Sequence, residues 1–229
     1  MKKKRMLIAA VVALGFLPFG SVLSQEGSES GFSVGSDFYS SYIWRGTKYG
    51  SGPAVQPSLK YSKDWFTIGA WGSFDFSEYQ EADLSFSVAL PAGFSLGVTD
   101  YYFPGMEYSD YSEASGSHAF ELNGGFTAGN FNLTANFIFN KAGGAGSSGR
   151  DKYFQAGYSF KFFNIFVGAG DGWHTYDSDT GESNFAVCNL GIGTSRTIKV
   201  TDSFNIPVNG QLIFNPDKNQ MFLVVGFTL

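Results

Sequence analysis

The chain has 229 residues, of which 15 are basic and 20 acidic, and its formal net charge of −5 argues against a nucleic-acid partner. Charged residues make up only 15% of the chain, whereas it contains 30 glycines and 25 phenylalanines. Because a soluble domain carries about 25% charged residues, this composition favours a β-barrel whose aromatic outer surface faces lipid. The single cysteine, Cys188, excludes an intrachain disulfide.

The first 24 residues predict a cleaved secretory signal peptide. Residues 2–5 are basic, residues 6–19 form an apolar run, and residues 21–24 offer small side chains at cleavage spacing. The apolar run is shorter than the roughly 20 residues of a membrane-spanning helix, which disfavours a retained anchor. The mature chain, residues 25–229, keeps 11 basic and 20 acidic residues and a net charge of −9.

From residue 32 onward, hydrophobic and polar residues alternate, which is the period of a β-strand with one apolar face. The first strand is expected to keep one register from Phe32 to Arg45. The clearest pair of strands covers residues 81–90 and 94–102, on either side of a short turn. Residues 185–192 lack a clean alternation, so their register is not predicted. Further strands are expected near residues 55–61, 66–76, 120–123, 131–140, 154–161, 165–169, 204–212 and 221–229.

The connections between these segments alternate between long loops and short turns. Loops are expected near residues 46, 78, 110, 146, 177 and 217, and turns near residues 63, 92, 129, 162 and 198. Pro57 cannot donate to a strand ladder, so we expect a bulge there. The pattern predicts an all-β fold, a single closed antiparallel transmembrane β-barrel of about 12 strands in the bacterial outer membrane, with both termini in the periplasm. A secreted β-sandwich is the alternative, but the apolar face recurs on nearly every strand and a closed barrel satisfies every backbone group in lipid.

Five short segments resemble the TorF-like family of small outer-membrane porins. These are Tyr42–Gly46, Pro53–Pro57, Gly69–Ser73, Glu81–Leu84 and Tyr101–Gly105. The resemblance implies an outer-membrane role or passive diffusion, without fixing a solute. The terminal Leu229 departs from the phenylalanine with which such barrels often end, so Phe227 is expected to serve the barrel assembly machinery during biogenesis.

A set of charged residues is predicted to point into the barrel near its extracellular rim and to line the pore: Arg45, Asp75, Glu81, Asp83 and Glu121. Isolated charges do not face lipid, and carboxylates opposite an arginine create a field that favours cations. The alternative is that Arg45 forms salt bridges with Asp83 and Glu81 that plug a narrow barrel.

Aromatic residues are predicted to form girdles at the two membrane interfaces. The outer girdle would contain Tyr42, Trp44 and Phe74, and the inner one Tyr61, Trp65, Phe94 and Phe131. In contrast, Trp71, Tyr101 and Phe166 are predicted to point inward, where they would stack on a sugar or close the lumen.

No combination of residues points to an enzyme, a metal or a cofactor. Ser117 and His118 are neighbours on a strand and therefore point to opposite faces, while His174, Asp177 and Ser178 lie together only in a loop. Residues 177–182 lack the ligand spacing of a calcium loop. The sequence therefore predicts a narrow passive channel for small solutes with weak cation preference, embedded in the outer-membrane lipid bilayer. The alternative is a closed structural or adhesive barrel whose extracellular loops bind a partner.

Overall fold

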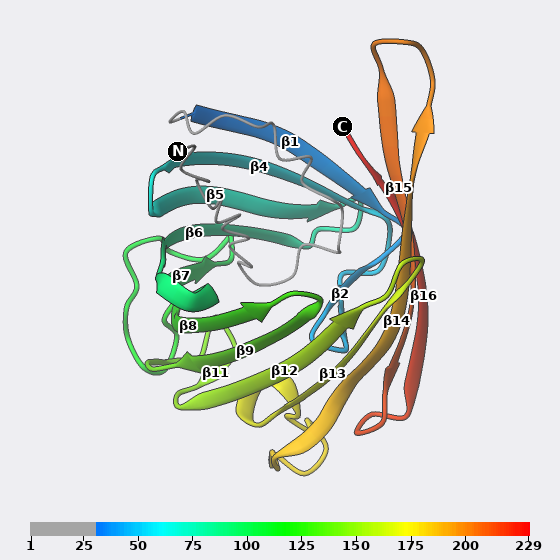
Figure 1. Cartoon of the computed structure of the whole chain (residues 1–229). Helices are drawn as coiled ribbons and strands as arrows, with labels where there is room; N and C mark the ends of the chain where they lie inside the picture. Colours follow the sequence, from blue (N-terminus) through cyan, green and yellow to red (C-terminus); the bar gives the residue numbers. More distant parts are fainter. Residues whose placement is uncertain (1–30) are drawn as a thin grey trace.

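A computed structural model describes residues 31–229, so the predicted signal peptide, residues 1–24, and residues 25–30 lie outside the described residues. Within them, twelve antiparallel strands pair in chain order, and the first strand closes on the last (Figure 1). The predicted closed barrel is therefore confirmed. The strands are β1 (Gly31–Tyr39), β4 (Ala54–Lys63), β5 (Phe66–Asp75), β6 (Gln80–Ala89), β7 (Phe94–Tyr102), β8 (His118–Ala128), β9 (Phe131–Ile138), β12 (Asp151–Ser159), β13 (Asn164–Gly170), β14 (Ala186–Lys199), β15 (Asn205–Asn215) and β16 (Gln220–Thr228).

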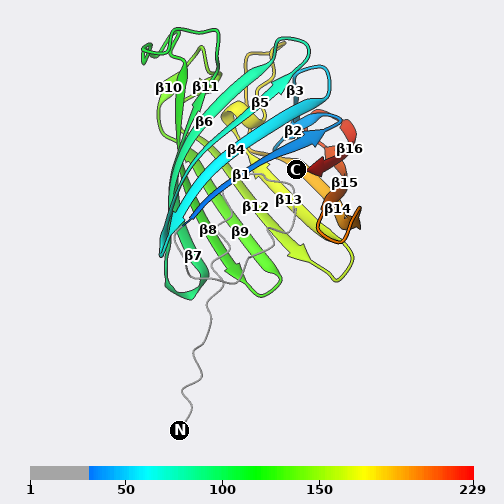
Figure 2. The ribbon, with the colours of Figure 1, turned by 90° about the horizontal axis from the view of Figure 1, so that it is seen from above.

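Four short strands and two single-turn helices lie in the connections. One hairpin pairs β2 (Tyr42–Trp44) with β3 (Thr47–Tyr49), and another pairs β10 (Lys141–Ala142) with β11 (Ser147–Ser148). The 3-10 turns are η1 (Pro91–Gly93) and η2 (Gly172–His174). In Figure 2, the loop with β10 and β11 lies at the upper end of the barrel and the turn between β6 and β7 at the lower end. We call these the extracellular and the periplasmic end, because barrels of this class carry their longer loops outside the cell. None of the helices in the described part of the chain has the length and apolar character needed to cross a membrane.

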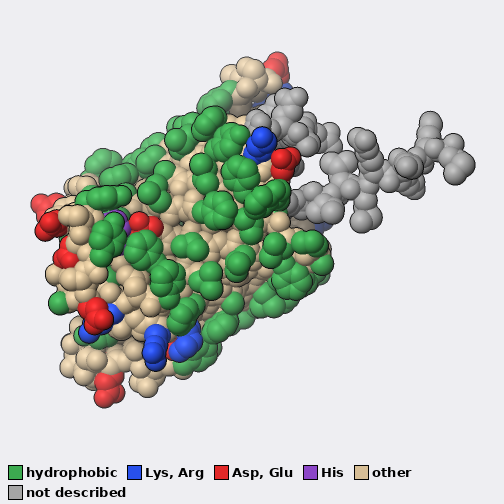
Figure 3. All heavy atoms as spheres, turned by 90° about the vertical axis from the view of Figure 1, so that its left-hand side faces the viewer, with side chains coloured by type: hydrophobic (Ala, Val, Ile, Leu, Met, Phe, Trp, Pro, Cys, Tyr) green, Lys and Arg blue, Asp and Glu red, His purple; other side chains and the backbone are tan. Residues whose placement is uncertain are grey.

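The outer wall of the barrel is covered by apolar side chains. Phe32, Leu84, Leu96 and Ile165 are among many large hydrophobic residues exposed on outward positions of the strands. Figure 3 shows these side chains spread over the wall, with charged residues gathered mainly toward its ends. A continuous apolar surface of this extent is incompatible with water as the surrounding solvent. The chain is a transmembrane β-barrel of the bacterial outer-membrane type.

The structure corrects two predictions and supplies the register that the sequence left open. The first strand ends at Tyr39 instead of continuing to Arg45. The bulge expected at Pro57 is absent, because the β4–β5 pairing omits Gln56 and Pro57 and resumes in the same register, from Val55↔Phe74 to Ser58↔Trp71. The register shift lies instead on β14 at Cys188, between Gly168↔Asn189 and Ala169↔Val187. The extra residue of this β-bulge explains the lost alternation around residues 185–192.

Candidate functional site in the barrel lumen

The hairpin formed by β2 and β3 folds into the barrel lumen. All three residues of β2 are buried, and β2 contacts β16 on the barrel wall (Figure 1). At the hairpin turn, Gly46 has a φ of 84°, and a Cβ there would overlap the carbonyl oxygen of Cys188 on β14. The Asn215 side chain donates a hydrogen bond to the carbonyl oxygen of Gly46 at 3.0 Å. Glycine is therefore required for the hairpin tip to lie against the wall.

Tyr42 and Trp44 lie inside the barrel, so their predicted place in the outer aromatic girdle is wrong. Only 7% and 5% of their surfaces are exposed. The Tyr42 ring lies 5.6 Å from that of inward-facing Trp71, and the Trp44 ring lies 5.6 Å from Tyr101 and 5.1 Å from Trp173. The chain reverses after Tyr39, which breaks the register on which the prediction rested. Together these aromatic rings fill the extracellular half of the lumen.

Arg45 anchors the hairpin to the opposite wall through a buried ion pair. Its guanidinium donates to Glu121 Oε1 at 2.7 Å and lies 4.5 Å from the ring centroids of both Trp44 and Tyr153. Arg45 is 1% exposed. Burial opposes its charge, but the nearby Glu121 carboxylate raises the pKa of Arg45 above its ordinary value, so Arg45 stays protonated. Breaking such a buried pair on one side costs about 3–5 kcal/mol.

His174, from η2, completes this cluster and was not predicted as a site residue. Arg45 Nη1 lies 3.2 Å from His174 Nε2, and because a guanidinium only donates, Nε2 accepts and the proton resides on Nδ1. Burial, and then the neighbouring charge of Arg45, lower the pKa of His174 well below its ordinary value. The imidazole is therefore neutral. Nothing in the local sequence distinguishes His174 from a surface loop histidine, because its position depends on how the connection over residues 171–185 folds inward.

The predicted carboxylates all lie on inward positions of their strands but play different structural roles. Glu81 accepts a hydrogen bond from the Tyr79 hydroxyl at 2.6 Å, whereas Asp83 Oδ1 is buried without a partner. Asp75 lies at the rim and accepts from the backbone N–H groups of Ser51, Ser77 and Tyr79, so it shapes a loop. The partner of Arg45 is Glu121, so the alternative pairing with Glu81 and Asp83 is wrong.

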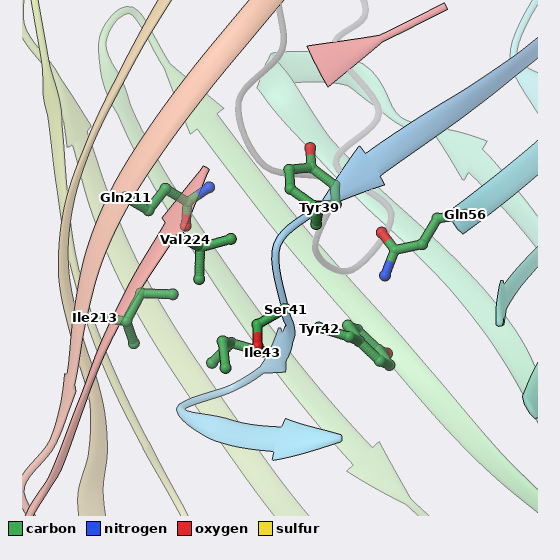
Figure 4. A pocket seen from close by; sticks show the side chains of 8 residues that line it. All are labelled: Tyr39, Ser41, Tyr42, Ile43, Gln56, Gln211, Ile213 and Val224. Carbon is green, nitrogen blue, oxygen red and sulfur yellow. The ribbon is translucent and has the colours of Figure 1, made fainter. Parts of the chain in front are cut away.

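The periplasmic half of the lumen has a different lining. Below the hairpin, most inward side chains are polar, uncharged and partly exposed: Ser58, Ser85, Ser95, Asn132, Thr134, Gln155, Asn164, Ser195, Asn209 and Gln211. Asp37 on β1 and Lys60 on β4 also point inward there. A small pocket lies between the start of the hairpin and the adjacent strands β15 and β16 (Figure 4). In that view Ser41 and Ile43, on the segment that follows β1, face Ile213 of β15 and Val224 of β16, the strands next to β1 in the wall. The lumen is thus polar up to the hairpin and closed by aromatic rings above it.

The other five predicted interface aromatics lie on the outer surface. Phe74 is exposed near the extracellular end of β5, and Trp65 and Phe94 are exposed at periplasmic turns. Tyr61 and Phe131 occupy outward positions on β4 and β9, near the same end. This arrangement supports the predicted anchoring at the two membrane interfaces, which stays a prediction.

The second histidine lies outside the lumen. His118 is on the outward face of β8, where Nδ1 lies 2.8 Å from Asp100 Oδ1 and Nε2 lies 2.7 Å from the Tyr108 carbonyl oxygen. The rings of Tyr102 and Tyr111 stack on the imidazole. These contacts fix the loop over residues 103–117 to the outer wall. Among the described residues, no group of three or more histidine, cysteine or carboxylate side chains is arranged to hold a metal ion.

Comparison with known proteins adds no family to this description, since no family model and no curated protein matches the chain. Three solved structures of similar shape are a mutant of the Rh. blastica porin (12% identity, TM-score 0.40, 77% of this chain and 55% of the porin), OccAB3 of Acinetobacter baumannii (12%, 0.42, 84% and 59%) and OccK5 of Pseudomonas aeruginosa (14%, 0.39, 90% and 68%). The chain spans about half the length of the first of these porins. Similarity at this level carries no argument about function, which has to come from the lumen itself.

Proposed function

We propose that this protein is a narrow outer-membrane channel for small solutes, in which the β2–β3 hairpin forms the constriction. The observation that carries the proposal is the polar, partly exposed lining that runs from the periplasmic end up to the hairpin. A barrel whose interior served only as a packed core would be filled along its whole height. The hairpin belongs to a loop and contacts the wall through side chains and one backbone carbonyl, so its removal leaves the twelve-stranded ladder intact.

We further propose that the channel has a weak preference for cations. The Arg45–Glu121 pair carries no net charge. Five other acidic side chains point inward from the barrel strands, namely Asp37, Asp75, Glu81, Asp83 and Asp151. Between the two rims, Lys60 is the inward basic side chain of the described strands that faces them. An excess of carboxylates along a pore lowers the energy of a passing cation. The same proposal has three further parts. The chain is a porin of the TorF-like type, a small solute passes through it, and the assembly machinery recognises Phe227.

A closed barrel with an adhesive or structural role is the second candidate. The aromatic cluster around Trp44 favours it, because these rings fill the extracellular half of the lumen. The loop over residues 103–117 is also hydrogen-bonded to the β10–β11 loop, by Gly143 N–H to Glu113 O and by Ala145 N–H to Gly116 O. Such a rim offers a fixed surface to a partner. Conductance measurements separate the two candidates.

Shortening the hairpin tests the channel directly. Replacing residues 42–49 by a short Gly-Ser linker should raise single-channel conductance several-fold in planar bilayers, because the constriction is removed while every barrel strand remains. Replacing residues 178–181 of the exposed loop that follows η2 is the matched control and should leave conductance unchanged. If neither the native barrel nor the shortened one conducts ions, the closed-barrel candidate is favoured.

A double substitution of Glu81→Gln and Asp83→Asn tests ion preference. Because both side chains lie on the lumen face of β6, replacing their carboxyl groups by amides should shift the reversal potential in a salt gradient away from the cation value. The expected change in the cation-to-anion permeability ratio is a few-fold. The paired control, Asp179→Asn with Glu182→Gln, makes the same replacement in an exposed loop. An unchanged reversal potential in the β6 variant would remove these two residues from the selectivity site.

A further inference from the structure

His174 lies where two inserted segments of the lumen meet. Its ring centroid is 5.1 Å from the Trp44 ring of the hairpin and 5.1 Å from the Tyr153 ring of β12. Its Nε2 lies 3.2 Å from Arg45 Nη1, and only 2% of the residue is exposed. The residue therefore contacts the hairpin, the wall and the buried ion pair at once.

A proton on Nε2 is incompatible with this arrangement. It would remove the acceptor for the Arg45 N–H and place two cations side by side in a site closed to water. The other ring nitrogen, Nδ1, is buried without a hydrogen-bond partner, so no carboxylate is in place to stabilise an imidazolium. The contact between Arg45 and His174 holds only while the histidine is neutral.

The other ionisable groups around the cluster are already engaged or are not placed to compensate. Glu121 is bonded to Arg45, Tyr101 and Asn123. Asp151 accepts from Ser147 and Ser148, and Asp171 pairs with Lys152. The titratable and charged groups placed around His174 are Arg45, Tyr42, Lys48 and Tyr49 on the hairpin, Tyr101 on β7, Glu121 on β8, Asp151, Lys152 and Tyr153 on β12, Asp171 beside η2, Cys188 on β14, and Asp217 and Lys218 in the last loop.

We propose that His174 is a proton-operated latch: protonation of its imidazole releases the β2–β3 hairpin from the lumen. In the channel proposed above, release of the hairpin means that acidification opens the pore. This consequence rests on the proposed function. The direction of this pH effect follows from the lowered pKa of the buried histidine, since the released histidine binds a proton more readily than the buried one. At pH values above about 6.5 the latch is engaged, and below that value each further pH unit favours the released hairpin by up to about tenfold, until the buried imidazole itself titrates.

The native cysteine reports the position of the hairpin. Cys188 is fully buried, and its carbonyl lies against Gly46. Its outward-facing neighbour Val187 is 41% exposed, so a thiol that pointed outward would be exposed as well. The thiol therefore points inward, and we expect release of the hairpin to expose it to the lumen. The experiment measures the rate at which a polar maleimide labels Cys188 in the full-length barrel in lipid vesicles, between about pH 7.5 and about pH 5. Native protein is compared with the His174→Gln variant, because glutamine retains an acceptor but does not titrate.

The quantity to compare is the ratio of the two labelling rates at each pH, since the pH dependence of thiol reactivity itself is shared and cancels. The expected ratio of native to variant rises about tenfold or more between neutral and acid pH. Equal pH profiles for the two proteins would overturn the proposal, because carboxylates such as Glu121 would then account for any release. His118→Gln is the matched control, and it should keep the native profile because that histidine lies on the outer wall. Retention of heat-modifiable migration on gels checks that each variant is folded.

Conductance recorded on the same samples separates the latch from the channel. If acid uncovers Cys188 without raising conductance, the latch stands and the channel proposal fails. If conductance is present but the labelling ratio is flat, the channel stands and the latch fails.

Discussion

Glu121→Ala should drive the hairpin out of the lumen and increase the labelling rate of Cys188 by about a hundredfold or more. The substitution leaves the Arg45 guanidinium, 1% exposed, without its carboxylate at 2.7 Å. An unpaired buried charge costs about 3–5 kcal/mol, and a cost above about 2.7 kcal/mol shifts a two-state population more than a hundredfold. Because the hairpin can leave while the barrel strands stay paired, the cost appears as release of the hairpin. The measurement is maleimide labelling at neutral pH, followed by single-channel conductance.

Two variants make this expectation specific. Arg45→Met combined with Glu121→Gln removes both charges, so it should label much more slowly than Glu121→Ala alone, since no unpaired charge remains. Asp202→Ala breaks the Lys199–Asp202 pair, which is closer at 2.6 Å but exposed on both sides. An exposed pair of this kind contributes little, so labelling should stay at the native rate. Slow labelling of Glu121→Ala would mean that Arg45 does not hold the hairpin.

The barrel could be predicted because its strands obey one simple rule. Lipid requires an apolar side chain at every second position, as in Phe94, Leu96 and Val98, and water in the lumen requires polar ones between them. The same rule placed Glu81, Asp83 and Glu121 on the inward face. Where the backbone departs from regular pairing, as at the Cys188 bulge, the alternation is lost and register could not be predicted.

The hairpin could not be predicted for the opposite reason. Tyr42 and Trp44 continue the alternation of β1, so the sequence is as consistent with a longer strand as with a chain that reverses after Tyr39. Tertiary contacts decide between the two, because the aromatic rings of Trp71, Tyr101 and Trp173 provide a surface inside the barrel on which the hairpin packs. Such contacts join residues far apart in sequence and leave no local periodic signal.

The position of Gly46 did carry a signal, because glycine at a hairpin tip indicates a positive φ or a close approach of two backbones. Both are present, since its φ is 84° and its α-carbon faces the Cys188 carbonyl. Arg45, just before it, also has a positive φ of 50°. The tip is therefore shaped to bring Arg45 to Glu121, which links the loop conformation to the buried ion pair.

Gly46→Ala should displace the hairpin almost as effectively as loss of Glu121. A Cβ at this position would overlap the Cys188 carbonyl oxygen and lie 2.9 Å from its carbonyl carbon. That carbonyl belongs to β14, which is held between β13 and β15, so the hairpin has to move instead. The shift would also break the hydrogen bond from Asn215 to the Gly46 carbonyl. The expected result is fast labelling of Cys188 at neutral pH in a barrel that still migrates as folded on gels.

Gly181→Ala separates the two contributions at Gly46. Gly181 has a similar φ of 72°, but nothing lies within 4 Å of its ideal Cβ. Alanine at such a φ costs about 1–2 kcal/mol from backbone strain alone, and in this exposed loop that strain should leave Cys188 labelling at the native rate. The difference between the two alanine variants therefore measures the clash with β14. If Gly46→Ala labels as slowly as Gly181→Ala, the hairpin tip does not rest on the barrel wall at Cys188.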